Sequence, residues 1–204
     1  MEWLVIGYIG LILLTVVTIL NRKYVTFYPY VKTLTSTTFL VAALIHHSTF
    51  FWVTTVVFCY FLGDVLLACA NRGQKKLLFF AGMLSFAFGH ILFIRYWMDS
   101  PSQLILLIGC SLILSALLIK IILRLNLNLK AMVLPVQGYL IILLTLFLLS
   151  FIQMPRFYTI IVILFFSSDI FLVFWYFKPG VHRWVKVINV ILYFSAVGLL
   201  AFLG

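Results

Sequence analysis

Eight long apolar runs follow one another along the chain, separated by short polar segments. Each is about the length that a helix needs to cross a bilayer, roughly 17–25 residues. The predicted spans are 3–20, 33–47, 50–70, 77–96, 102–120, 131–152, 156–177 and 183–203. The second run starts with several threonines, whose hydroxyls can bond back to helix carbonyls, so it still predicts a span. The pattern therefore predicts an all-α membrane protein with eight transmembrane helices in one domain.

Composition supports a bilayer as the solvent of this chain. Hydrophobic residues make up 66% of the 204 residues and the mean hydropathy is +1.26, whereas a soluble domain is about 45–50% apolar. No basic segment precedes the first run and no cleavage pattern follows it, so a removable signal peptide is not expected. The short chain and the lack of an appended soluble segment favour a bacterial inner membrane.

Basic residues predict the orientation of the spans. The chain has 14 Lys and Arg against 4 Asp and Glu, a net charge of +10. All basic residues except Arg95 and Arg156 lie in the loops after the odd-numbered runs. The positive-inside rule then places these loops in the cytoplasm and both termini outside. Because this role accounts for the positive charge, a nucleic-acid partner is not expected.

Two of the four acidic residues lie inside apolar runs. A charge near the bilayer centre costs roughly 2.5–3.5 kcal/mol, so such residues are usually functional. Asp64 and Asp169 occupy equivalent places in the third and seventh spans, on the order of 10 Å from the cytoplasmic end. Their spacing is consistent with two parallel four-helix halves. It predicts a paired acid/base site; the alternative is that each Asp bonds a neighbouring hydroxyl and only joins helices.

Further polar residues fall at a similar depth and are expected to face a shared pocket, because hydrocarbon cannot satisfy them. They are Thr35, Ser36, Thr38, Tyr139, Asn189 and Tyr193, with His90 lying deeper. His90 either bridges two helices or orients an Asp and shares its proton. Lys32, at the foot of the second span, is either a topology signal or a phosphate ligand. No third acidic ligand is present for a metal, so neither a metal nor another cofactor is expected.

A series of short motifs follows along the chain: Lys32 with Leu34-Thr35, Gly63-Asp64 with Leu66-Leu67, Gly82 through Phe86 to His90, Pro135 with Tyr139, Ser168-Asp169, and Tyr193. Their order and spacing resemble those of the lysoplasmalogenase (YhhN-like) family of integral membrane hydrolases. The chain departs from the family pattern at Thr33 for Pro, Phe93 for Tyr, and Val197 for Gln. Both Asp positions are intact, so the departures concern substrate range more than chemistry.

The resemblance implies hydrolysis of the vinyl ether bond of a lysoplasmalogen to a fatty aldehyde and a glycerophospho-alcohol. Such a bond breaks when its alkene carbon is protonated and water adds to the resulting oxocarbenium ion, which calls for an acid, an anion and a base. Asp64, Asp169 and His90 are the predicted catalytic residues. The predicted substrate-binding residues are Lys32, Thr35, Tyr139, Asn189 and Tyr193. The expected partners are a lysophospholipid and the bilayer, with the active site nearer the cytoplasmic side.

Other functions use the same residues. A proton-coupled lipid or small-molecule transporter could use the Asp pair as a proton relay. An intramembrane aspartyl protease fits poorly, because Phe61 replaces the first glycine of its Gly-x-Gly-Asp signature and Ser168 stands where Tyr precedes the second Asp. A lipid-binding subunit without catalysis would tolerate replacement of both aspartates.

Overall fold

The computed structural model describes residues 2–47, 51–70, 75–125, 127–129 and 132–204, and its regular structure there is entirely helical. The eight predicted helices are confirmed. They are α1 (Glu2–Leu20), α2 (Tyr28–His46), α3 (Phe51–Cys69), α4 (Lys76–Trp97), α5 (Pro101–Arg124), α6 (Val133–Ile152), α7 (Arg156–Phe177) and α8 (Arg183–Leu203), with a 3₁₀ helix, η1 (Arg22–Phe27), before α2.

Helix α2 differs most from its predicted span. It begins at Tyr28 rather than at residue 33, and Pro29 stands in its first turn, where a missing N–H costs nothing. Among the described residues, the other seven helices are long and apolar enough to cross a membrane, and α2 is not one of them. Three polar residues of α2 are buried, namely Lys32, Thr35 and Ser36. Their side chains therefore point into the bundle.

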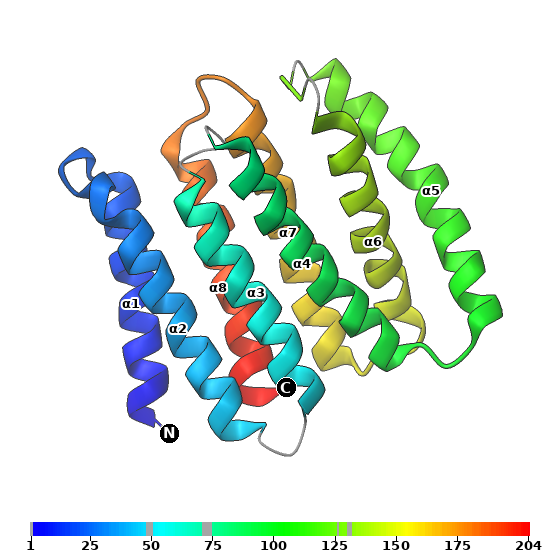
Figure 1. Ribbon diagram of the computed structural model, residues 1–204, viewed down its shortest axis with the longest axis horizontal. Coiled ribbons are helices and arrows are strands. Elements are labelled where there is room, and N and C mark those ends of the chain that lie inside the picture. Colours follow the sequence, from blue (N-terminus) through cyan, green and yellow to red (C-terminus); the bar gives the residue numbers. More distant parts are fainter. Residues whose placement is uncertain (1, 48–50, 71–74, 126, 130–131) are drawn as a thin grey trace.

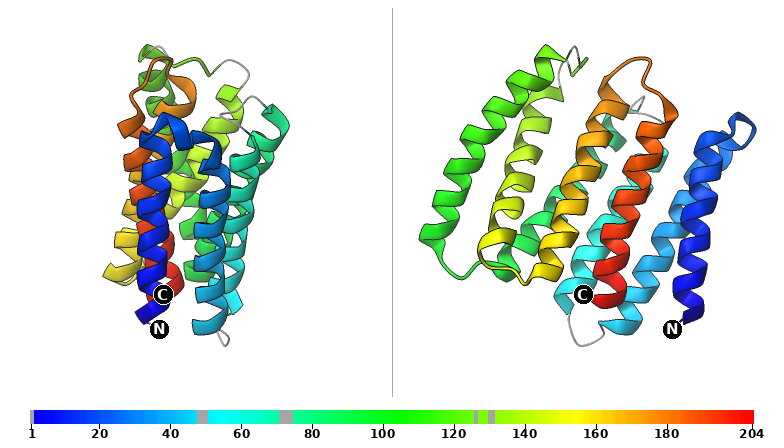
Figure 2. Two further views of the ribbon diagram at one scale, coloured as in Figure 1. Left: turned by 90° about the vertical axis from the view of Figure 1, so that its left-hand side faces the viewer. Right: turned by 180° about the vertical axis from the view of Figure 1, so that it is seen from behind.

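The helices form two layers. Helices α2, α3 and α4 lie side by side in one layer, and α1, α8 and α7 form the other (Figures 1 and 2). Helix α6 closes one side by packing against α4 and α7, and α5 packs against α6 alone among the described residues. Helix α8 contacts α1, α2 and α3 as well as α7, so the two halves of the chain interlock. Both termini lie at one end of the bundle (Figure 1); which side of a membrane that end faces stays a prediction.

Glycines allow α3 and α4 to approach closely. A Cβ on Gly63 of α3 would lie 2.6 Å from the Phe86 ring of α4, and a Cβ on Gly89 of α4 would lie 2.6 Å from the Tyr60 ring of α3. Small residues let helix backbones approach in membrane proteins, where packing rather than the hydrophobic effect holds helices together. This contact places Asp64 beside α4 and Tyr60 beside His90.

Replacing Gly89 by alanine is expected to lower the free energy of unfolding by about 1–3 kcal/mol, because Tyr60 is fully buried and cannot move away from the new methyl group. Thermal unfolding in detergent measures the change. Gly109→Ala is the matched control, since a Cβ there meets nothing within 4 Å. Equal stability of the two variants would show that the α3–α4 contact is looser than described.

Candidate active site

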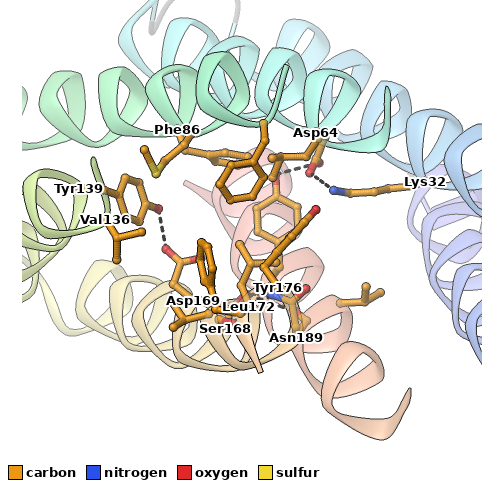
Figure 3. A pocket seen from close by; sticks show the side chains of 17 residues that line it. Lys32, Asp64, Phe86, Val136, Tyr139, Ser168, Asp169, Leu172, Tyr176 and Asn189 are labelled. Atoms are coloured by element: carbon orange, nitrogen blue, oxygen red, sulfur yellow. Dashed lines mark hydrogen bonds and ion pairs between the residues drawn. The ribbon is translucent and has the colours of Figure 1, made fainter. Parts of the chain in front are cut away.

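A cavity at the centre of the bundle is lined by residues of six helices, α2, α3, α4, α6, α7 and α8. Its volume, including its open mouth, is about 730 Å³. Asp64 of α3 and Asp169 of α7 both line it, on opposite sides (Figure 3). The rest of the wall is mainly apolar and includes Leu67, Phe79, Met83, Val136, Leu172, Val173 and Phe177. Two carboxyl groups therefore share one largely apolar cavity.

Asp64 is surrounded by groups that stabilise a negative charge. Its Oδ1 lies 2.8 Å from the Lys32 ammonium, and both side chains are almost completely buried. Its Oδ2 accepts hydrogen bonds from the Ser36 hydroxyl at 2.6 Å and the Tyr193 hydroxyl at 2.8 Å. A buried ion pair is favourable only when further hydrogen bonds satisfy the charged groups, and the Ser36 and Tyr193 hydroxyls do so for the carboxylate. All three contacts favour the ionised form of this carboxyl group, and Figure 3 shows the one with Lys32.

Asp169 has different surroundings. Its Oδ2 accepts a hydrogen bond from the Tyr139 hydroxyl at 2.5 Å, and no cation lies within ion-pair distance of it among the residues that the structure describes. On α7, Leu172 and Val173 line the same wall and are apolar, and the adjacent Ser168 hydroxyl donates to the Asn189 carbonyl rather than to Asp169. An isolated charge is costly in such a place, whereas a neutral carboxylic acid is not.

A chain of hydrogen bonds leads from Asp169 away from the cavity. The Tyr139 oxygen lies 3.1 Å from His90 Nε2, and His90 Nδ1 lies 2.8 Å from the Tyr60 hydroxyl. Because Tyr139 donates its proton to Asp169, its oxygen accepts from His90, and Nε2 therefore carries the imidazole proton. Nδ1 then accepts from Tyr60. The direction of the first bond thus fixes the tautomer of His90 and the roles of every donor in the chain.

The comparisons with known proteins identify the family. The model of the YhhN family matches residues 27–203. The chain belongs to the YhhN family. The match includes every residue that lines the cavity, and it confirms the family that the sequence motifs resemble. No curated protein and no solved structure matches the chain.

Most of the site residues predicted for this YhhN-family protein lie at the cavity. Asp64, Asp169, Lys32, Tyr139, Asn189 and Tyr193 all line it. Asn189 also joins α8 to α7, because its side-chain amide donates to the Ser168 backbone oxygen at 3.0 Å and hydroxyl at 2.8 Å. A residue of the cavity wall therefore also links two neighbouring helices of one layer.

Two of the predicted catalytic or substrate-binding residues do not line the cavity, and a third is paired within the protein. Thr35 does not line the cavity; its hydroxyl bonds the Val31 carbonyl and the Thr15 hydroxyl of α1. His90 does not line it either, and contacts Asp169 only through Tyr139. Lys32, predicted to meet a phosphate, is instead paired with Asp64. Depth along a helix was the basis for these predictions, and depth does not specify which face a side chain occupies.

Tyr60 was not predicted as part of the site, and Ser36 was predicted only to lie at the depth of the pocket. Ser36 bonds Asp64, and Tyr60 bonds His90. Helical spacing held a signal for both, because Ser36 is four residues after Lys32 and Tyr60 is four residues before Asp64. Residues four apart lie on one face of a helix, so each shares a face with a predicted site residue.

Replacing Tyr60 by phenylalanine is expected to lower the free energy of unfolding by about 1–3 kcal/mol, because His90 Nδ1 is then buried without a donor. Tyr28→Phe is the matched control. The Tyr28 hydroxyl is buried and has no hydrogen-bond partner among the described residues, so its loss should leave stability nearly unchanged. Thermal unfolding of both variants in detergent measures the difference, and equal midpoints would contradict the hydrogen-bond chain.

Proposed function

We propose that this YhhN-family protein is an intramembrane hydrolase that cleaves the vinyl ether bond of lysoplasmalogen-type lysophospholipids. The observation that carries the proposal is the contrast between two carboxyl groups on one cavity: Asp64 has a cation and two hydroxyl donors, and Asp169 has a single tyrosine donor. Pairs of carboxyl groups in contrasting environments divide acid and anion roles between them.

Asp169 is the proposed acid. With Oδ2 accepting from Tyr139, the proton sits on Oδ1 and is transferred to the alkene carbon farther from the ether oxygen. Positioned proton transfer of this kind contributes about 10²–10⁴-fold to a rate. The hydrogen bonds of His90 and Tyr60 hold the Tyr139 hydroxyl in place, and this hydroxyl in turn positions the Asp169 carboxyl group. His90 is a positioning residue in this scheme.

Asp64 is the proposed anion. Protonation of the alkene carbon leaves an oxocarbenium ion, and a fixed carboxylate in a largely apolar cavity stabilises that charge more than bulk water would. Lys32, Ser36 and Tyr193 hold the carboxylate in place. Its negative charge is therefore present before the reaction begins and needs no reorganisation.

The remaining steps balance with water as the second reactant. Water adds to the oxocarbenium carbon and gives one proton to the Asp169 carboxylate, which restores the acid. The resulting hemiacetal transfers its hydroxyl proton to the ether oxygen as the carbon–oxygen bond breaks. The products are a fatty aldehyde and a glycerophospho-alcohol. The apolar wall of Val136, Leu172 and Val173 suits the aliphatic chain.

The test is aldehyde release from a 1-alkenyl lysophospholipid by the purified protein in detergent. In D₂O the aldehyde should carry one deuterium on the carbon next to the carbonyl, because the acid delivers solvent-derived deuterium to carbon. The saturated 1-alkyl analogue is the matched control and should give no product. A folded protein that releases no aldehyde, or releases it without deuterium, would contradict the proposal.

A further inference from the structure

A second cavity adjoins the candidate active site. Its volume, including its opening, is about 750 Å³, and Leu67 and Tyr176 line both cavities. Two basic residues of α8, Arg183 and Lys186, contribute to its wall together with Tyr28 of α2. It lies at the ends of α1, α3 and α7 and the beginning of α8, the end of the bundle opposite the two termini (Figure 1).

The two basic side chains of this cavity are fixed in place by contacts with other residues. Lys186 is only 4% exposed, and its ammonium lies 3.2 Å from Asn189 Oδ1 and 5.5 Å from the centroid of the Tyr28 ring. Arg183 donates from Nη1 to the carbonyls of Ile19 and Leu20, at 3.3 and 3.1 Å. A fixed guanidinium and a fixed ammonium on one cavity wall lose little entropy when they bind an anion.

The Tyr28 side chain adds a neutral hydrogen-bond donor to these two cations. The Tyr28 hydroxyl is buried and has no hydrogen-bond partner among the described residues. Buried hydroxyls are normally paired, and an exception calls for an explanation such as an absent ligand. An oxygen-rich anion in the cavity would accept a hydrogen bond from Tyr28 and charge-assisted ones from Lys186 and Arg183.

We propose that the second cavity binds the phosphate group of a lysophospholipid whose reactive bond lies in the first cavity; this inference rests on the proposed function. Lys32 does not fill this role, because it is paired with Asp64. The phosphate lies beside Lys186, the glycerol passes Tyr176 and the vinyl ether reaches Asp169. Tyr176 lines both cavities, and Figure 3 shows it at the first one. One amphiphile thus spans both cavities, with its phosphate at the cationic end.

Direct binding tests the inference without catalysis. The two probes are a tritiated 1-alkyl lysophosphatidylcholine, which lacks the reactive double bond, and the matching 1-alkylglycerol, which lacks the phosphate. Lys186→Gln should weaken binding of the phosphate-bearing probe about tenfold or more, and Tyr28→Phe about threefold or more. Neither variant should change alkylglycerol binding more than about twofold. Lys186→Arg should recover part of the lost affinity, because it keeps the charge.

Lys75→Gln is the matched control, because it removes one positive charge from an exposed position outside both cavities. Thermal unfolding confirms that each variant is folded. Equal losses for the two probes, or no loss for either, would overturn the phosphate site even if the protein releases aldehyde. Selective loss for the phosphate-bearing probe supports the site even if no aldehyde is released, in which case the hydrolase proposal alone fails.

Discussion

Replacing Asp169 by asparagine is expected to reduce aldehyde release by about a hundred- to ten-thousandfold, the contribution of a positioned general acid. The amide has the same shape, and its oxygen can still accept the hydrogen bond from Tyr139. It has no acidic proton to give to the alkene carbon. Because Asp169 has no ion-pair partner in the described part of the chain, the substitution strands no opposite charge. The measurement is the initial rate of aldehyde release at saturating substrate.

Two controls accompany this variant. Asp99→Asn makes the same chemical change at an exposed position outside the cavity and should leave the rate within about twofold of the wild type. The unfolding midpoint of Asp169→Asn should match the wild type, so that lost activity is not lost fold. A folded Asp169→Asn protein with nearly full activity would rule out Asp169 as the acid.

Replacing Lys32 by methionine is expected to lower the free energy of unfolding by about 3–5 kcal/mol, the cost of leaving a buried charge without its partner. Asp64→Asn should cost a similar amount, because it strands the Lys32 ammonium instead. The double variant should recover most of the loss, since an asparagine can still accept from Ser36 and Tyr193 and no charge remains buried. All three variants should be inactive, because each removes or misplaces the Asp64 carboxylate.

Thermal or denaturant unfolding of the four proteins in detergent gives the coupling energy between the two charges. The side chains of Lys32 and Asp64 are 7% and 1% exposed, so solvent does not screen the pair. If the losses of the single variants simply add in the double variant, the two residues do not act as a pair. An active double variant would show that the pair stabilises the bundle but takes no part in the reaction. It would exclude Asp64 as the anion.

The helices could be predicted because the bilayer requires long apolar runs and the loops between them are short and polar. The beginning of α2 could not, since Tyr28 and the polar residues after it do not look like part of a span. Its Lys32, Thr35 and Ser36 are satisfied by other helices, which hydropathy does not register. Hydropathy therefore does not identify α2 as a membrane span, because this helix carries polar side chains into the interior of the bundle.

The site was predicted from depth, and depth was enough to place Asp64 and Asp169 on one cavity. Depth could not separate Thr35 from Ser36, because adjacent residues point about 100° apart around a helix. Thr35 faces α1 and Ser36 faces Asp64. The pairing of Lys32 with Asp64 was missed for another reason. It depends on how α2 rotates against α3, and packing of the whole bundle decides that rotation.

The hydrogen-bond chain that begins at Asp169 ends at Tyr60, a side chain with no exposed surface, packed against Phe86 and Phe165. Within the described residues, this series of hydrogen bonds does not reach the other end of the bundle. Under the proposed mechanism, we therefore expect the protons that Asp169 gives and regains to pass through the cavity. A transporter that harnesses a proton gradient needs access from both sides in turn. For the proposed hydrolase, which needs no such alternation, we expect aldehyde release to proceed alike in energised and de-energised membranes.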